Sequence, residues 1–354
     1  MLRTYHPDLP QDSWTPDFLG GDLRARALPL AQVPTQPAVA TLVHDAPGDR
    51  APASVAVLYV HGWTDYFFNR EMAEFFTAVG AEFYALDMHG SGRSLRPHQV
   101  PGYVADLREY FPDLDAAAAF IRAEHPELPL VILAHSQGGL TAALWARERA
   151  SEGLILNAPW LDLPHSPAAR ALLTPAAEVW GWIAPRAMVP IPSPRLYEQV
   201  ISADFGGEWR INDEWRPDPR APSRPGWARA ILRAQNELSQ GLGLTLPMLT
   251  ITSHASLIST RWREEMRHLD IVTDVRGTWR RVPLLGTNFE IIKVRGAVHD
   301  VLLSEPGVRA RAYQEIREWL ARHRFIGEHS LSGNDASLTR SPTGIGESRT
   351  RRSR

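Results

Sequence analysis

The sequence predicts an α/β fold in which a mostly parallel central sheet carries helices on both faces. Short β-branched and apolar runs alternate with longer helical patterns through the first 160 residues, which is typical of parallel strands joined by helices. The same alternation resumes near residue 246, so we expect one sheet interrupted by an insertion. A chain of 354 residues is long enough for this arrangement and buries a sizeable core.

The predicted elements follow in chain order. Strands at 23–30 and 38–46 come first, because their in-out alternation and flanking prolines suit a one-sided antiparallel edge. Buried strands are expected at 54–60, 81–87, 128–134 and 153–159, with helices between them at 69–79, 104–124 and 138–149. Strands at 246–253 and 289–296 and an amphipathic helix around 309–323 complete the pattern.

This order divides the chain into four parts. Residues 1–159 form the N-terminal part of the core and 247–325 its C-terminal part. The segment 160–246 contains six of the twelve tryptophans and eleven of the 29 prolines, and we expect a helical cap there, with short helices at 172–191 and 195–205. Residues 326–354 are rich in Ser, Gly and Arg, which predicts a disordered tail.

Composition excludes several classes of function. The chain has no cysteine, so disulfides, cysteine-ligated zinc, iron–sulfur clusters and a thiol nucleophile are excluded. Its net charge of −2 provides no electrostatic footprint for nucleic acid, and a small uncharged partner is favoured. The first residues lack a signal-peptide pattern and the apolar runs are only strand-length, so we expect a cytoplasmic protein without stable membrane insertion. The oligomeric state stays open.

The segment Ala134-His135-Ser136-Gln137-Gly138 is predicted to form a nucleophile elbow. It follows a buried strand, precedes a helix and has small residues two positions on either side of Ser136, as such a sharp turn requires. Ala134 stands where glycine is usual. The alternative is that Ser136 only caps the following helix.

A second strand, 54–60, runs into a His-Gly turn, HGWTDYF (61–67). We expect the backbone N–H groups of Trp63 and Gln137 to form an oxyanion hole, with Gly62 permitting a close approach of the chain. Taken alone, an ordinary strand-end turn is the simpler interpretation.

Four segments together resemble the α/β-hydrolase superfamily, in its monoacylglycerol lipase, lysophospholipase and serine aminopeptidase-like branch. They are HGWTDY (61–66), LDMHGSGRS (86–94), AHSQGG (134–139) and RGAVHDVLLSEP (295–306). The resemblance covers roughly residues 20–325. It implies an α/β-hydrolase fold and a serine hydrolase that needs no cofactor. His89, in the second segment, receives no catalytic role.

The resemblance also implies a base and an acid for Ser136. His299 follows the strand at 289–296 and precedes the last helix, where the base is expected. The acid is expected just after the strand at 246–253, but His254-Ala255-Ser256-Leu257 contains no carboxylate. We therefore predict Asp270 as the acid, after an inserted loop at 254–268. Asp274 is the main rival, and a helix cap or surface carboxylate is the alternative role for either residue.

The expected activity is hydrolysis of a lipid-like carboxylic ester, such as a monoacylglycerol or lysophospholipid, through a Ser-His-Asp acyl-enzyme mechanism. One or two of the cap tryptophans are expected to line an apolar acyl pocket. A serine aminopeptidase-type peptide hydrolase is one alternative; it would hold the substrate amine with acidic residues of the cap, for which Asp204, Glu208, Asp213 and Glu214 are the candidates. The other is a catalytically silent binding protein on the same scaffold. The scattered histidines predict no metal site.

Overall fold

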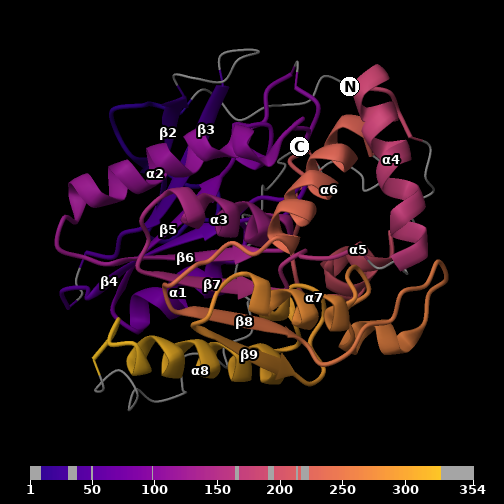
Figure 1. Ribbon diagram of the computed structural model, residues 1–354. Coiled ribbons are helices and arrows are strands. Elements are labelled where there is room, and N and C mark those ends of the chain that lie inside the picture. The colour runs from indigo at the N-terminus through magenta and orange to yellow at the C-terminus, as the bar shows by residue number, and fades with distance from the viewer. Residues whose placement is uncertain are drawn as a thin grey trace, which may run out of the picture.

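The structure is a computed structural model that describes residues 9–30, 38–48, 51–97, 99–163, 167–189, 195–212, 214–216 and 223–327. Within these residues a nine-stranded sheet has the order β1-β2-β3-β5-β4-β6-β7-β8-β9 (Figure 1). The strands are Thr15–Pro16, Leu23–Leu30, Ala38–Asp45, Val55–Val60, Ala81–Asp87, Leu130–His135, Gly153–Asn157, Met248–Ser253 and Phe289–Val294, numbered β1 to β9.

Both pairing modes occur in this sheet. The pairs β1–β2, β2–β3 and β3–β5 are antiparallel, whereas every neighbouring pair from β5 to β9 is parallel. The predicted fold class is confirmed, including the antiparallel edge at 23–30 and 38–46. The two-residue strand β1, which extends this edge, was not predicted because it is too short to show a pattern.

Each face of the sheet has its own apolar core. On β4, Ala56, Leu58 and Val60 pack into one core and Val55, Val57 and Tyr59 into the other, as expected for a strand buried on both faces. Helices α2 (Phe111–Glu124), α3 (Gln137–Glu148) and α6 (Pro225–Ser239) contribute to the first core. Helices α1 (Arg70–Ala78) and α8 (Pro306–Arg322) contribute to the second.

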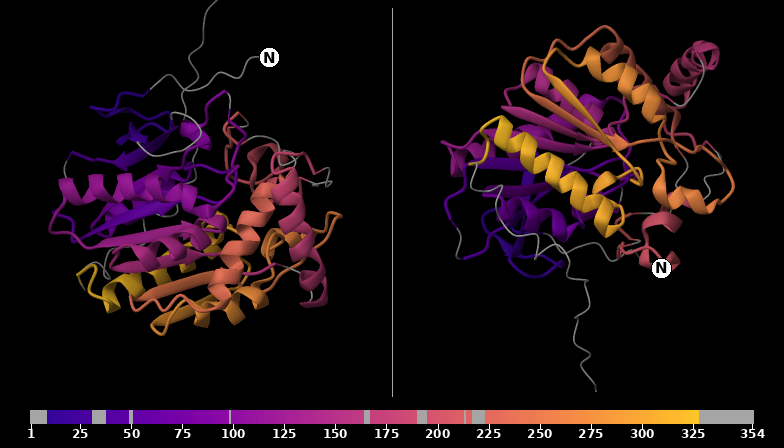
Figure 2. Two further views of the ribbon diagram at one scale, coloured as in Figure 1. Left: turned by 45° about the horizontal axis from the view of Figure 1, so that its top comes forward. Right: turned by 90° about the horizontal axis from the view of Figure 1, so that it is seen from below.

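The segment between β7 and β8 contains helices α4 (Pro167–Ile183), α5 (Leu196–Ile201) and α6. It leaves the sheet at the carboxyl end of β7, the same edge at which the parallel neighbour β6 ends at His135. Figures 1 and 2 show these helices gathered at this end of the molecule, with α4 beside α6. Helix α6 was not predicted, and the residues beyond Gly327 lie outside the described part of the chain. Among the described residues, no helix is long and apolar enough to cross a membrane.

Candidate active site

Ser136 lies in the tight turn between β6 and α3. Its backbone has φ 52° and ψ −119°, a conformation that residues other than glycine rarely adopt and that is strained. The residue precedes the first helical residue, but its side chain makes no capping hydrogen bond. Instead its Oγ lies 3.0 Å from Nε2 of His299. The geometry is that of a nucleophile elbow, and the capping interaction considered for Ser136 is not formed.

Two glycines allow the chain to close tightly around this serine. A Cβ added at Gly138 would lie 2.3 Å from the backbone oxygen of His61, and one added at Gly62 would lie 3.3 Å from Cβ of Ser136. The turn after β4 and the start of α3 are therefore in backbone contact. This contact places the Gly62–Trp63 turn beside Ser136 and the first turn of α3.

The backbone N–H groups of Trp63 and Gln137 are the predicted oxyanion donors. In the described part of the chain, neither donates a hydrogen bond to another backbone or side-chain acceptor. Gln137 is also the first residue of α3, so its N–H is one of those that a helix start leaves without an intrahelical partner. Both N–H groups are thus without an internal acceptor in the described part of the chain.

His299 is held in a short loop that follows β9. Asn157, at the end of β7, organises both this loop and the elbow. Its carbonyl oxygen accepts from the N–H of Ser136 at 3.0 Å. Its side chain donates to Asp300 at 2.6 Å and accepts from the N–H of Val301 at 3.1 Å. Sequence reasoning missed Asn157, because nothing in the residues around it indicates that its partners lie 143 and 144 positions away.

Asp270 accepts a hydrogen bond from Nδ1 of His299, with Oδ2 2.9 Å away. The same oxygen accepts from the Thr273 hydroxyl at 2.7 Å, and Oδ1 accepts from the N–H groups of Val272 and Thr273 at 2.8 Å each. Complete burial alone would raise the pKa of this carboxyl, but the charge and hydrogen bonds of His299 and Thr273 outweigh it and lower the pKa. Asp270 is therefore a buried, ionised carboxylate against the imidazole.

The position of Asp270 depends on a chain excursion after β8. The ends of this loop are joined by backbone hydrogen bonds, from Leu257 N–H to the Asp270 carbonyl at 2.8 Å and from Asp270 N–H to the Ala255 carbonyl at 3.1 Å. Met266, inside the loop, is fully buried in an apolar cluster with residues of the segment between β7 and β8, among them Leu196 and Trp215. The paired ends of the loop place Asp270 near the carboxyl end of β8, where the acid is expected.

Asp274, the rival to Asp270, has a different role. It precedes helix α7 (Val275–Arg281), and its Oδ1 accepts from the N–H of Arg276 at 3.1 Å. This is the helix-capping interaction that was considered for both carboxylates. The structure brings Ser136, His299 and Asp270 into one hydrogen-bonded chain and leaves Asp274 outside it.

Several buried polar groups beside the Ser136–His299–Asp270 hydrogen bonds were not predicted. His135, whose ring centre is 5.0 Å from that of His299, is buried, and burial together with the nearby His299 lowers its pKa to about 3. Neither of its ring nitrogens has a hydrogen-bond partner among the described residues. Asp65 is also buried, 3.7 Å from Nε of the cap residue Arg216. His135 is thus neutral, and the charges of Asp65 and Arg216 shift its pKa in opposite directions.

The six tryptophans of the segment 160–246 separate into three groups. Trp180 and Trp182 are exposed by 45% and 74%. Trp209 and Trp215 pack in the apolar cluster around Tyr66 and Phe68. Trp227 stacks on Trp63 of the predicted oxyanion turn, with ring centres 4.1 Å apart, and Trp160 packs against Trp227 at 5.7 Å.

Three of the four acidic residues considered for binding a substrate amine lie in the described part of the chain. Glu208 accepts from Arg309 at 2.8 Å, while Asp204 and Glu214 are exposed. Asp213 lies outside the described residues. In the described part of the chain, no three His, Asp or Glu side chains are grouped so as to hold a metal ion.

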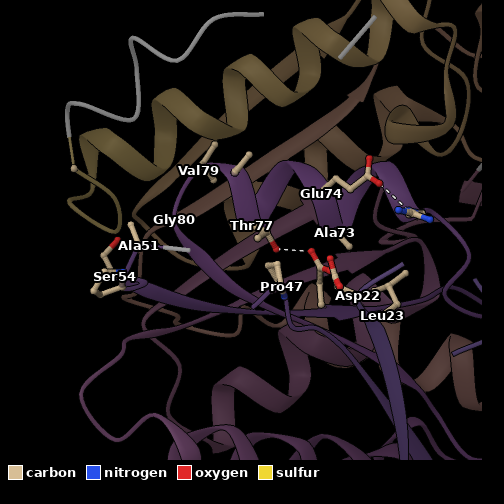
Figure 3. A pocket seen from close by; sticks show the side chains of 15 residues that line it. Asp22, Leu23, Pro47, Ala51, Ser54, Ala73, Glu74, Thr77, Val79 and Gly80 are labelled. Atoms are coloured by element: carbon tan, nitrogen blue, oxygen red, sulfur yellow. Dashed lines mark hydrogen bonds and ion pairs between the residues drawn. The ribbon is translucent and has the colours of Figure 1, made fainter. Parts of the chain in front are cut away.

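A cavity of about 700 Å³ lies at the opposite edge of the sheet (Figure 3). Ser54, which lines it, precedes β4, whereas Ser136 follows the parallel strand β6. Thr77 of α1, another lining residue, donates to Asp45 at 2.7 Å. The cavity contains no member of the Ser136 site, and its side chains make internal polar contacts.

The sheet order, the strained elbow and the Ser-His-Asp chain define an α/β-hydrolase. A family model described as Serine aminopeptidase, S33, matches residues 51–266. The chain belongs to this family of hydrolases.

Proteins of known function and known structure agree with this assignment. The chain is 25% identical over 285 residues to the monoacylglycerol lipase of Mycolicibacterium smegmatis, an alignment that covers 78% of this chain and 90% of the relative. It is 25% identical over 260 residues to human monoglyceride lipase, covering 71% and 77%. The structure of a monoacylglycerol lipase from Paleococcus ferrophilus superimposes with a TM-score of 0.57 at 21% identity, covering 77% of this chain and 96% of that one, which supports the fold.

Proposed function

We propose that this chain hydrolyses carboxylic esters, with Ser136 as nucleophile, His299 as base and Asp270 as the acid that orients the base. The observation that carries the proposal is the unbroken hydrogen-bonded path from Ser136 Oγ to His299 Nε2, at 3.0 Å, and from His299 Nδ1 to Asp270 Oδ2, at 2.9 Å. A serine hydroxyl needs such an imidazole to remove its proton.

The reaction proceeds in two steps. His299 Nε2 takes the Ser136 proton as Oγ bonds to the ester carbonyl carbon, and the N–H groups of Trp63 and Gln137 stabilise the oxyanion. The C–O bond to the alcohol then breaks, and His299 returns the proton to the departing oxygen. Water attacks the acyl-enzyme by the same route, which releases the acid and restores Ser136. Asp270 stabilises the imidazolium that forms in each step.

The proposed substrate is an ester with an apolar acyl chain, such as a monoacylglycerol or a lysophospholipid. The aromatic cluster formed by stacked Trp63 and Trp227 and the tilted ring of Trp160 supports an apolar ligand, because ligand sites are usually lined by aromatic side chains. The names of the relatives, which are monoacylglycerol and monoglyceride lipases, support the same class.

Peptide hydrolysis from the N-terminus is the second candidate, favoured by the description of the matching family. It requires a carboxylate that binds the substrate amine. Parallel assays with p-nitrophenyl esters and with proline and alanine p-nitroanilides separate the two activities. Turnover of esters and not of nitroanilides is expected, and turnover of nitroanilides alone would refute the ester proposal.

Labelling with a fluorophosphonate tests whether the site is catalytic at all. Wild-type protein is expected to label and Ser136→Ala is not, while a control variant, Asp274→Asn, labels as wild type because Asn also caps a helix well. If wild-type protein does not label and hydrolyses no ester, the chain is a binding protein and the proposal fails.

A further inference from the structure

Trp227 is the one cap tryptophan in the described residues that contacts both residues of the proposed oxyanion hole. Its indole N–H donates to Oε1 of Gln137 at 2.8 Å. Its ring lies on that of Trp63, with centres 4.1 Å apart and planes inclined by 20°. Trp227 is 7% exposed and belongs to helix α6 of the inserted segment, so these contacts link the insertion to the core.

The Trp63 turn depends on such contacts for its conformation. The next residue, Thr64, has φ 48°, which is costly for a β-branched side chain. The edge of the Trp63 indole is held by a hydrogen bond from Nε1 to the Gly102 carbonyl at 3.1 Å. A Cβ at Gly102 would come within 2.9 Å of that ring. Trp227 covers the ring face, so the indole is fixed on two sides.

The Gln137 side chain depends on Trp227 in a second way. It is buried at the start of α3, and its Nε2 has no hydrogen-bond partner among the described residues. Its Oε1 accepts from the Trp227 indole, and the Tyr110 hydroxyl is a further polar neighbour of the amide. Loss of the Trp227 bond removes the donor from buried Oε1, in the residue whose backbone N–H is proposed to face the oxyanion.

We propose that Trp227 is a positioning residue that fixes the backbone N–H groups of Trp63 and Gln137 relative to each other. The oxyanion hole is then complete only while α6 packs against the core. The inference rests on the proposed ester hydrolysis. Because the oxyanion exists only in the transition state and the intermediates, loss of Trp227 lowers kcat and leaves KM nearly unchanged.

Three variants test the two contacts separately. Trp227→Phe keeps a ring on Trp63 but removes the indole N–H, Gln137→Met removes the acceptor, and Trp227→Leu removes both the bond and the stack. We expect kcat to fall about threefold to tenfold in the first two, with no further loss when they are combined. Trp227→Leu is expected to lose about tenfold to a hundredfold, approaching the loss of one oxyanion donor. Trp145→Phe is the matched control, because Trp145 is a buried tryptophan of α3 that donates to Asp115 at 2.8 Å, away from the site.

The inhibition constant of a trifluoromethyl ketone distinguishes positioning from general packing. This ketone forms a tetrahedral adduct with serine whose oxygen occupies the oxyanion hole, so its inhibition constant should rise in proportion to the loss of kcat/KM. An unchanged kcat in Trp227→Leu, whether or not KM rises, overturns the inference. The proposed function still stands in that case if the wild-type protein hydrolyses esters. If wild-type protein neither turns over esters nor binds the ketone, the proposed function itself fails, and the inference with it.

Discussion

Replacement of Asp270 by asparagine tests the proposed acid most directly, because the surrounding donors dictate how an amide must sit. Oδ1 of Asp270 accepts from two backbone N–H groups, those of Val272 and Thr273, which cannot become acceptors. The amide oxygen of Asn must therefore take the Oδ1 position, and its NH₂ group must face Nδ1 of His299 where Oδ2 now lies 2.9 Å away.

This orientation reverses the histidine tautomer. With Nδ1 accepting from the amide, the ring proton moves to Nε2, which then faces the Ser136 hydroxyl 3.0 Å away and cannot take its proton. We expect kcat to fall by about 10⁴-fold, equivalent to about 5.5 kcal/mol in the activation barrier. Hydrolysis of a p-nitrophenyl ester under saturating substrate measures this loss.

The matched control is Asp274→Asn, four residues away. Asp274 caps α7, and asparagine caps a helix about as well as aspartate, so activity within twofold of wild type is expected. Circular dichroism and thermal unfolding of both variants would show whether the fold is kept. Substantial activity in Asp270→Asn, or a large loss in Asp274→Asn, would show that the acid has been assigned to the wrong residue.

Three further perturbations follow from packing and charge. Gly138→Ala places a methyl group 2.3 Å from the His61 carbonyl oxygen. Turnover should therefore fall, and the free energy of unfolding should fall by about 2–4 kcal/mol; a stable, active variant would contradict the close contact. Met266→Ala empties a fully buried position and should cost about 2–5 kcal/mol in urea unfolding, whereas an unchanged midpoint would mean that the excursion is not anchored there. The pKa of His135 is lowered to about 3, below its ordinary 6.5, so the unfolded chain binds this proton first and stability is lost as the pH falls below 6.5. Between pH 7 and pH 5 this effect should lower the free energy of unfolding by about 2 kcal/mol. His135→Asn should remove that part of the pH dependence, and an equal change in unfolding free energy with pH for the variant and the wild type would refute the assignment.

Much of the fold followed from local patterns. Apolar runs of strand length alternate with helical periodicity, and both signals lie within neighbouring residues, so the strands and most core helices were predicted close to their observed bounds. The two-residue strand β1 and the inserted helix α6 were missed. Strand β1 is too short to show the alternation of apolar and polar residues that is typical of a strand. The region around α6 was recognised only by its tryptophans and prolines.

The elbow was predictable for the same reason, since its strand, sharp turn and helix are contiguous. Ser136, Gln137 and Gly138 occur within three residues, and the steric demand for small neighbours is visible in the sequence itself. His299 required the order of segments along the chain as well, because a histidine outside such an order has no distinguishing neighbour.

The choice between the two candidate acids depends on tertiary structure. Asp270 and Asp274 are four residues apart and chemically identical. Backbone hydrogen bonds to Ala255 and Leu257 hold Asp270 near the end of β8, where it contacts His299, whereas Asp274 caps α7. The same holds for Asn157, which joins the elbow to the His299 loop across more than 140 residues, and for Trp227, which reaches Gln137 across 90. Local sequence encodes backbone conformation and burial, but a hydrogen bond between distant segments exists only after the sheet has brought their strand ends to a common edge.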